Sequence, residues 1–412
     1  MPSLRARLGV LLCLYVAQGL PTGIYNQALP AILRAHGVSL TAISLTALLA
    51  APWALKAFWA PWVDRWYWPR LGRSRSWILP LQLFCVGAIA AIAGFDPASL
   101  RTSAGLAEFF VLMFLLNLMA ATQDIATDAL AVRTLQPGER AAGNSIQVAG
   151  YRAGLILGGG LLLYLLGAWT WSGAFLGVSV LLLVLTLPMA VFRETDGAAA
   201  EPRHASYSEV FRAFLRTPGV RLWLPVLLTY KVAEGFGSAM VKPMLVDMGF
   251  DLRQLGLQIT VLGSAGTVLG AGLGGLLVNR LGRVRALIGF GVVQALGLGG
   301  YGLLSAGWLP CSPQEPGWAY VLNAAEHLAG GLATVALLTV VMDHARHAHA
   351  GSDFTLQVSL LAVTGGLAHM GAGIVAQTLG YTVYYLLAMG FGFALLWPAV
   401  RWGRAINPRV LV

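Results

Sequence analysis

Long apolar runs alternate with short polar segments along the whole chain. Each run holds about 20 residues, enough for a helix to cross a hydrocarbon core of about 30 Å. We predict twelve membrane-spanning helices, at about residues 8–33, 42–63, 77–95, 107–132, 142–166, 171–192, 221–246, 255–278, 286–307, 318–342, 353–378 and 381–400. The pattern therefore predicts an all-α polytopic membrane protein.

A polar segment at residues 193–220 divides these helices six and six. It contains "RETDGAAAEPRHAS", which is typical of a linker, so we predict helix bundles at residues 1–192 and 221–412. A repeated loop supports two pseudo-symmetric halves, because Asp64-Arg65 and Leu71-Gly72-Arg73 in the first half match Asn279-Arg280 and Leu281-Gly282-Arg283 in the second.

Composition agrees with a membrane protein and excludes a soluble domain. The 412 residues are 57% hydrophobic and 11% charged. The net charge of +10 would suggest nucleic acid in a soluble protein. Here most of the basic residues lie in alternate loops, which is the positive-inside pattern and predicts both termini in the cytoplasm. We therefore expect a lipid bilayer around the chain, no nucleic-acid partner and a monomer.

Nothing in the sequence predicts a bound metal or cofactor. The three cysteines are scattered and form neither a disulfide framework nor a metal motif. The histidines of "DHARHAHAGSD" (343–353) fit a solvated basic loop better than a metal site.

Charged residues inside the spans are expensive and should face a partner or a water-filled cavity. Counting 1.5 Å per residue from the inner helix ends places Lys56, Asp124, Arg152 and Lys231 about 12 to 18 Å deep. We expect Asp124 to pair with Arg152 or Lys56, either as a permanent structural ion pair or in substrate binding. Asp128, about 7 Å deep by the same count, fits better with the loop charges.

Other polar residues complete two sets of candidates. Pro21 allows a kink beside a polar stripe on the first span, and the neighbours Glu326 and His327 could titrate near neutral pH as a proton site. Candidate cavity residues are Gln18, Tyr25, Asn26, Lys56, Gln123, Asp124, Arg152, Tyr230, Lys231, Glu234, Asn323, Glu326 and His327. Candidate gating residues are Asp64, Arg65, Gly72, Arg73, Asp128, Arg133, Asn279, Arg280, Gly282 and Arg283.

Two glycine ladders mark close helix packing. Glycines recur every four residues from Gly150 to Gly158 and from Gly266 to Gly274, a spacing that lets helix backbones approach closely. We predict that these helices form the seam between the halves.

The repeated loop resembles the signature loop of the major facilitator superfamily. The resemblance implies twelve helices, alternating access around a midplane site, and an inner charge cluster that latches one closed state. The second copy carries Asn279 where the family pattern has an acid, so the latch should be asymmetric.

The first half resembles a narrower group, the muropeptide permeases (AmpG) and acetyl-coenzyme A transporters. The matching strings are Gly-Leu-Pro at 19–21, Trp59 and Pro61 before Asp64-Arg65, Gln-Asp-Ile-x-x-Asp-Ala at 123–129, and Gly-Tyr-Arg-x-Gly at 150–154.

Within that group the chain is most similar to compact siderophore permeases of the rhizobactin and pyochelin type. That resemblance implies import of a ferric siderophore such as ferric pyochelin across a bacterial inner membrane, with iron only as part of the substrate and with possible proton coupling. A muropeptide permease is the alternative. An intramembrane enzyme is disfavoured, because no Ser-His or His-Asp constellation lies at matched depth.

Overall fold

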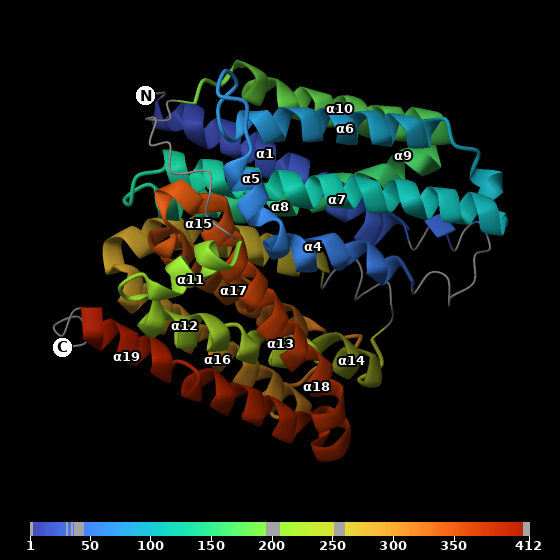
Figure 1. The fold of residues 1–412 in the computed structure, drawn as a ribbon. Coiled ribbons are helices and arrows are strands. Elements are labelled where there is room, and N and C mark those ends of the chain that lie inside the picture. Colours follow the sequence, from blue (N-terminus) through green and yellow to red (C-terminus); the bar gives the residue numbers. More distant parts are fainter. Residues whose placement is uncertain are drawn as a thin grey trace. The chain divides into compact units, whose positions relative to one another are not determined.

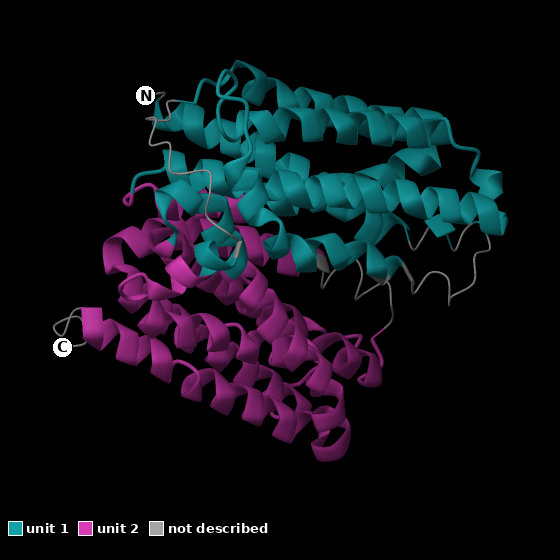
Figure 2. Cartoon of the chain, viewed as in Figure 1, with its two compact units in different colours: residues 1–136, 149–211, 345–356 teal, residues 137–148, 212–344, 357–412 magenta. Residues whose placement is uncertain are grey.

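The computed structural model describes residues 3–29, 32–33, 36, 45–194, 207–250 and 260–406. All regular secondary structure in these residues is helical, as the sequence predicts. The chain forms two compact units (Figure 2). Unit 1 holds residues 1–136, 149–211 and 345–356, and unit 2 holds residues 137–148, 212–344 and 357–412.

Unit 1 is built on four long helices that share one apolar core (Figure 1). They are α1 (Leu4–Gly23), α6 (Arg75–Ala93), α7 (Ser103–Thr134) and α10 (Trp171–Val191). Hydroxyl caps set two of the starts, because Thr102 Oγ1 accepts from Gly105 N and Thr170 Oγ1 accepts from Gly173 N, both at 3.1 Å.

Shorter helical segments complete unit 1. They are the π-helical turn η1 (Ile24–Ala28), η2 (Leu45–Ala50), α4 (Ala51–Leu55), η3 (Lys56–Phe58), α5 (Ala60–Arg65), η4 (Pro97–Arg101), α8 (Arg140–Ile156), η5 (Leu157–Leu161), α9 (Leu162–Ala168), α11 (Tyr207–Arg216) and η7 (His347–His349). The units divide α8 between residues 148 and 149, and α11 between residues 211 and 212.

Unit 2 has its own core, in which Tyr301, Tyr384 and Tyr385 are fully buried. Its helices are α12 (Val220–Thr229), α13 (Val232–Ser238), α14 (Val241–Asp247), α15 (Thr260–Leu281), α16 (Arg283–Ser305), α17 (Gly317–His344), α18 (Ala350–Ala394) and α19 (Trp397–Ile406). The first turns of α18, up to residue 356, belong to unit 1.

Nine helices in the described ranges are long and apolar enough to cross a membrane. The difference from twelve has local causes. The predicted spans 42–63 and 221–246 are broken into short helices, with prolines at the starts of α4 and α5. The predicted spans 353–378 and 381–400 both fall in α18, but its backbone is non-helical at Gly380 (φ 74°), which confirms the predicted break between them.

The glycines of each ladder pack inside one unit, but the two helices also meet as predicted, where Ser145 Oγ of α8 donates to the Ala271 carbonyl of α15 at 2.7 Å. A Cβ on Gly154 would meet backbone atoms of Val16 and Gly19 of α1 closer than 3.0 Å. A Cβ on Gly270 would meet the backbone of Leu328 of α17 equally closely. Glycine at these positions therefore allows α8 to pack closely against α1, and α15 against α17.

Candidate functional site

Asp64, the last acid of α5, caps the start of α18. Its Oδ2 accepts hydrogen bonds from Ser352 N at 2.6 Å and Ser352 Oγ at 2.7 Å, and its Oδ1 accepts from Gly351 N at 3.2 Å. The carboxylate is buried. A negative charge at a helix N-terminus satisfies unpaired N–H groups and complements the helix dipole.

Two arginines lie at Asp64, one against its carboxylate and the other against its main-chain carbonyl. Arg133 Nη1 lies 3.6 Å from Asp64 Oδ1, and Arg133 Nη2 donates to Ser74 Oγ at 2.5 Å. Arg73 Nη2 donates to the Asp64 carbonyl at 3.2 Å and to the Ala348 carbonyl at 3.1 Å. We call Asp64, Arg73, Arg133 and residues 348–352 the Asp64 cluster. It gathers three of the predicted gating residues around the first turn of α18.

The loop before α18 is held by a second ion pair. Arg346 Nε and Nη2 donate to the two oxygens of Asp353 at 2.7 and 2.8 Å, and Arg346 Nη2 also donates to the Val210 carbonyl of α11 at 3.0 Å. Asp353 is fully buried, so this fork-like pair is geometrically specific.

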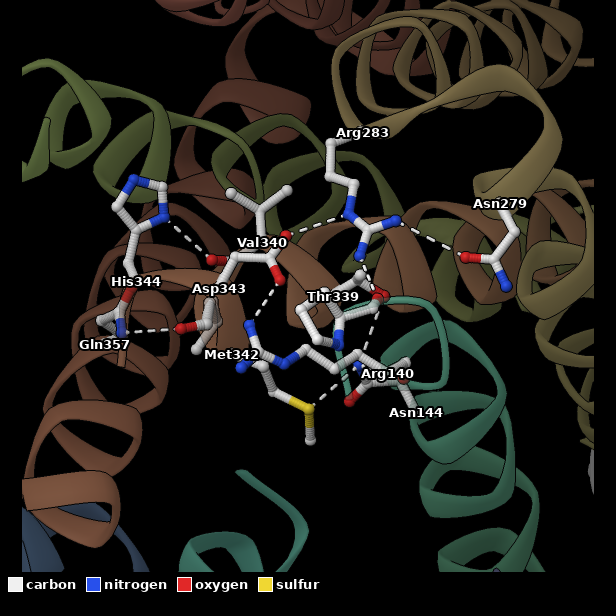
Figure 3. Close-up of polar contacts among 12 residues, drawn as sticks. Arg140, Asn144, Asn279, Arg283, Thr339, Val340, Met342, Asp343, His344 and Gln357 are labelled. Carbon is white, nitrogen blue, oxygen red and sulfur yellow. Dashed lines mark hydrogen bonds and ion pairs between the residues drawn. The ribbon is translucent and has the colours of Figure 1, made fainter. Parts of the chain in front are cut away.

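Unit 2 holds a counterpart centred on Asp343, at the end of α17 (Figure 3). Asp343 Oδ1 accepts from Arg140 Nη1 at 2.6 Å, and its Oδ2 accepts from Arg283 Nε at 2.9 Å. Asn279 Nδ2 donates to the Gly138 carbonyl at 2.8 Å, while its Oδ1 accepts from Arg283 at 3.5 Å. We call these residues the Asp343 cluster.

The acid occupies a different position in each of the two clusters. In unit 1 the acid Asp64 stands in the repeated loop and the base Arg133 near the end of α7. In unit 2 the loop carries neutral Asn279, and the acid Asp343 stands at the end of α17. The sequence predicted an asymmetric latch from Asn279 but missed Asp343. The sequence did contain a signal for Asp343, because this residue follows Arg133 by the same 210 residues that separate Arg73 from Arg283.

The remaining gating candidates have different surroundings. Gly72 and Gly282 have φ of +95° and +80°, which explains glycine at both positions. Arg65 and Arg280 are exposed and make no hydrogen bond or ion pair within the described ranges. Asp128, which depth counting placed with the loop charges, accepts a hydrogen bond from Tyr15 Oη at 3.2 Å.

A second polar group lies deeper in unit 1. Lys56 and Asp124 form a buried ion pair, whose side chains are 6% and 9% exposed. Of the two partners that the sequence left open for Asp124, the structure places Lys56 against it. The Lys56 ammonium also lies 5.5 Å from the centroid of the Trp53 ring, a cation–π distance, and Trp53 Nε1 donates to Asn117 Oδ1 at 3.3 Å.

Arg152 lies on α8, half-buried. Its guanidinium makes no hydrogen bond or ion pair with any residue that the structure describes, although its charge acts on the neighbouring Tyr151. An arginine at membrane depth with its five N–H donors uncommitted is suited to a planar carboxylate or phosphate.

The other cavity candidates of unit 1 differ in burial. Gln18 is buried and its Nε2 has no partner in the described chain, while Gln123 Nε2 donates to Thr127 Oγ1 at 3.0 Å. Tyr25 packs against the core and Asn26 is exposed. The predicted polar stripe of the first span is therefore only partly buried, and it ends in the π-helical turn that follows Pro21.

Unit 2 contains two further charged pairs at membrane depth. Lys231 pairs with Glu234 and donates to Thr334 Oγ1 at 2.8 Å. Glu326, 5% exposed in its side chain, has Oε2 at 2.6 Å from His327 Nδ1. A Cβ on Gly263 would meet the His327 ring closer than 3.0 Å, so that glycine makes the space for the imidazole.

The last two candidates of unit 2 are buried. Tyr230 Oη donates to the Leu287 carbonyl at 2.8 Å, and Tyr230 lines a small hollow with Glu234. Asn323 lies one helical turn before Glu326 and is 1% exposed.

The histidine-rich loop provides a packing residue. His344 stacks on Trp223 with ring centroids 5.1 Å apart and an interplanar angle of 9°. Its Nδ1 lies 2.9 Å from the Val340 carbonyl (Figure 3). Across the described ranges no group of three His, Cys, Asp or Glu side chains is placed to hold a metal ion.

Comparison with known proteins identifies the family. The sequence model of the Major Facilitator Superfamily matches residues 11–369. The chain belongs to the major facilitator superfamily. It is 31% identical over 393 residues to the anhydromuropeptide permease of Escherichia coli (strain K12), covering 93% of this chain and 77% of that relative.

Two other matches cover nearly the whole chain. A putative transporter, AmpG 4, of Rickettsia conorii (strain ATCC VR-613 / Malish 7) is 22% identical over 98% of both chains. The crystal structure of a bacterial homologue of the iron transporter ferroportin in an outward-facing state has a TM-score of 0.71, with 16% identity, and the match covers 97% of this chain and 99% of that one. At that identity the second match speaks for the fold alone.

These relatives are permeases and transporters rather than enzymes. The chain is a multi-pass secondary transporter of a bacterial inner membrane, and it carries small solutes. The resemblance to the muropeptide permease group is confirmed, and the resemblance to siderophore permeases stays a prediction.

Proposed function

We propose that this transporter imports a sugar–peptide of the anhydromuropeptide class from the periplasm to the cytoplasm. The observation that carries the proposal is the 31% identity to the anhydromuropeptide permease, which extends over 93% of this chain. The relatives favour this substrate over a ferric siderophore, which the resemblance to compact siderophore permeases had suggested.

The polar groups at membrane depth suit such a substrate. A sugar–peptide presents hydroxyls, amides and carboxylates, so its binding requires hydrogen-bonding groups and positive charge in an otherwise apolar site. Arg152 supplies a guanidinium with uncommitted donors, and the Lys56–Asp124 pair supplies both signs beside the Trp53 ring. The Trp53 face could cover the apolar side of a sugar ring.

Alternating access requires interactions that form in one state and break in another. The Asp64 cluster is suited to that role, because Asp64 holds the start of α18 by accepting three hydrogen bonds from Gly351 and Ser352. Release of that helix start would free the carboxylate and Arg133 together, which makes the contact a two-state element.

Uptake by membrane vesicles tests the substrate. Right-side-out vesicles containing the full chain should accumulate labelled anhydromuropeptide above empty vesicles, and unlabelled anhydromuropeptide should compete while a dipeptide does not. Vesicles that accumulate labelled ferric pyochelin but no anhydromuropeptide would reverse the assignment in favour of siderophore import. Accumulation of neither solute would remove both.

We also propose that protons drive this uptake, with Glu326 and His327 as the proton site. Support comes from their geometry, because the buried Glu326 carboxylate lies 2.6 Å from the His327 imidazole, and carboxylate and imidazole side chains are the groups that form proton relays in membrane proteins. The charge of Glu326 acts on the phenols of Tyr301 and Tyr385.

A further inference from the structure

A hollow of about 670 Å³ opens in unit 1 where α5 ends and α6 begins. Its wall includes Arg65, Trp66, Tyr67, Trp68, Trp77 and Pro80. That volume lies in the range of small-molecule sites. Neither the Asp64 cluster nor the Lys56–Asp124 pair uses it.

Hydrogen bonds fix the aromatic wall. Trp77 Nε1 donates to the Trp66 carbonyl at 2.5 Å, and Trp68 N donates to Ser76 Oγ at 2.9 Å. The Arg73 guanidinium lies 5.3 Å from the centroid of the Tyr67 ring. Trp66 and Trp68 nevertheless remain 60% and 64% exposed. Large aromatic rings held in place but left uncovered mark a surface that receives another molecule.

The rim of the hollow is positively charged. Arg65, the last residue of α5, lines it, and Arg70 lies in the loop that follows. Both side chains are exposed, and neither forms an ion pair or hydrogen bond with the part of the chain that the structure describes. Among the described residues these two cations have no counter-ion, and an anion supplied from outside would provide one.

The hollow continues onto a face of α6 that is suited to lipid. Pro80 belongs to the wall, and Leu83 and Phe84, one turn further along the helix, are 53% and 43% exposed. Because α6 starts at Arg75 and is apolar enough to span the membrane, its first turns lie at headgroup level. Tryptophan and arginine are the residues that favour that level.

We propose that this hollow binds the headgroup of an anionic phospholipid. The phosphate lies at Arg65 and Arg70, the glycerol region lies against Trp66 and Trp68, and the acyl chains follow Leu83 and Phe84 along α6. The combination of charge at the rim and apolar surface beyond it selects an amphiphile over a soluble anion.

Native mass spectrometry of the full chain in detergent tests the proposal. Titration with phosphatidylglycerol should give one lipid adduct that is retained at higher collision energy than any phosphatidylcholine adduct. Arg65→Gln and Trp68→Ala should each raise the apparent Kd for that adduct about fivefold, the equivalent of about 1 kcal/mol. Arg101→Gln and Trp308→Ala, which change an exposed arginine and tryptophan elsewhere, are the matched controls and should leave it unchanged.

Three results would overturn the site. Equal retention of phosphatidylcholine would remove the charge preference, and unchanged affinity in Trp68→Ala would place the lipid elsewhere. Displacement of the lipid by soluble glycerol phosphate at equal concentration would show that the hollow takes a free phosphate instead. If Arg65→Gln has a lowered Tm, its weaker lipid binding could come from a disturbed fold. In that case the Trp68→Ala result decides. Because the experiment measures lipid binding, its outcome does not depend on which substrate the protein transports.

Discussion

Asp64 accepts a hydrogen bond from the backbone N–H of Ser352 at 2.6 Å, although 288 residues separate them in the sequence. The same carboxylate lies 3.6 Å from Arg133. One buried acid thus caps a helix and neutralises a base. Removing it leaves the helix start without its cap and Arg133 without this acid, so its effect should exceed that of an ordinary helix cap.

Asp64→Ala should lower the free energy of unfolding by about 3 to 5 kcal/mol, since it leaves the buried Arg133 charge uncompensated as well as removing a cap. Thermal unfolding in detergent, followed by tryptophan fluorescence, measures the change. Asp96→Ala removes an exposed cap on Ala98 N and should cost about 1 kcal/mol. Equal losses in the two variants would contradict the double role of Asp64.

Moving the acidic group from position 343 to position 279 tests the Asp343 cluster. Asp343→Asn removes the partner of both Arg140 and Arg283 and should reduce both stability and uptake. Asn279→Asp alone should also be harmful, because a carboxylate would face the Gly138 carbonyl that Asn279 Nδ2 now donates to. The double variant should recover part of the loss, since Arg283 regains an acid. A double variant no better than Asp343→Asn would show that position 279 cannot take that role.

Paired substitutions at Lys56 and Asp124 separate a structural ion pair from a functional one. Lys56→Met or Asp124→Leu alone leaves one buried charge and should cost about 3 to 5 kcal/mol. The double variant leaves no charge and should unfold near the wild-type Tm, because apolar replacement of a buried pair is close to neutral. We expect it to lose at least tenfold in uptake. Retained uptake in the double variant would make the pair structural.

Glu326→Gln should uncouple transport from the proton gradient. The amide cannot bind the proton, so accumulation driven by an inward pH gradient should fall to the level reached without a gradient, while exchange of labelled for unlabelled substrate continues. Glu315→Gln, in an exposed loop, serves as the control. Gradient-driven accumulation that survives in Glu326→Gln would exclude Glu326 as the proton site.

Cys311 tests the predicted orientation, because it lies between α16 and α17 in a predicted outer loop. Partial burial raises the pKa of the Cys311 thiol. Since only the thiolate reacts, labelling by an impermeant maleimide on intact spheroplasts should be slow at pH 7 and accelerate about tenfold per pH unit. Cys311→Ser should abolish it. Labelling only after the membrane is opened would reverse the orientation.

The apolar pattern predicted the helices well, because a helix that crosses a bilayer requires a long run of apolar residues, which is easily recognised in a sequence. It failed where backbone geometry interrupts a span, as at α4 and α13. A window of hydrophobic residues carries no information on such breaks.

Depth counting placed Lys56 and Asp124 at one level, and they pair, but it left the partner of Asp124 open because it gives no rotation of one helix against another. The Asp64 contact was beyond sequence reasoning for a different reason. Its donors include the backbone N–H groups of Gly351 and Ser352, which every non-proline residue possesses and no motif marks.

Assignment of residues 137–148 to unit 2 and of residues 345–356 to unit 1 has a consequence for expression of the separate halves. A fragment that ends in the linker would keep Asp64 but lose Ser352, and its complement would keep Asp343 but lose Arg140. Each half-length polypeptide would therefore lack contacts that only the other supplies: Asp64 would keep Arg133 but lose the helix start that it caps, and Asp343 would keep Arg283 but lose Arg140. Co-expressed halves should rescue one another from degradation, and either half alone should be cleared by the cell's proteases.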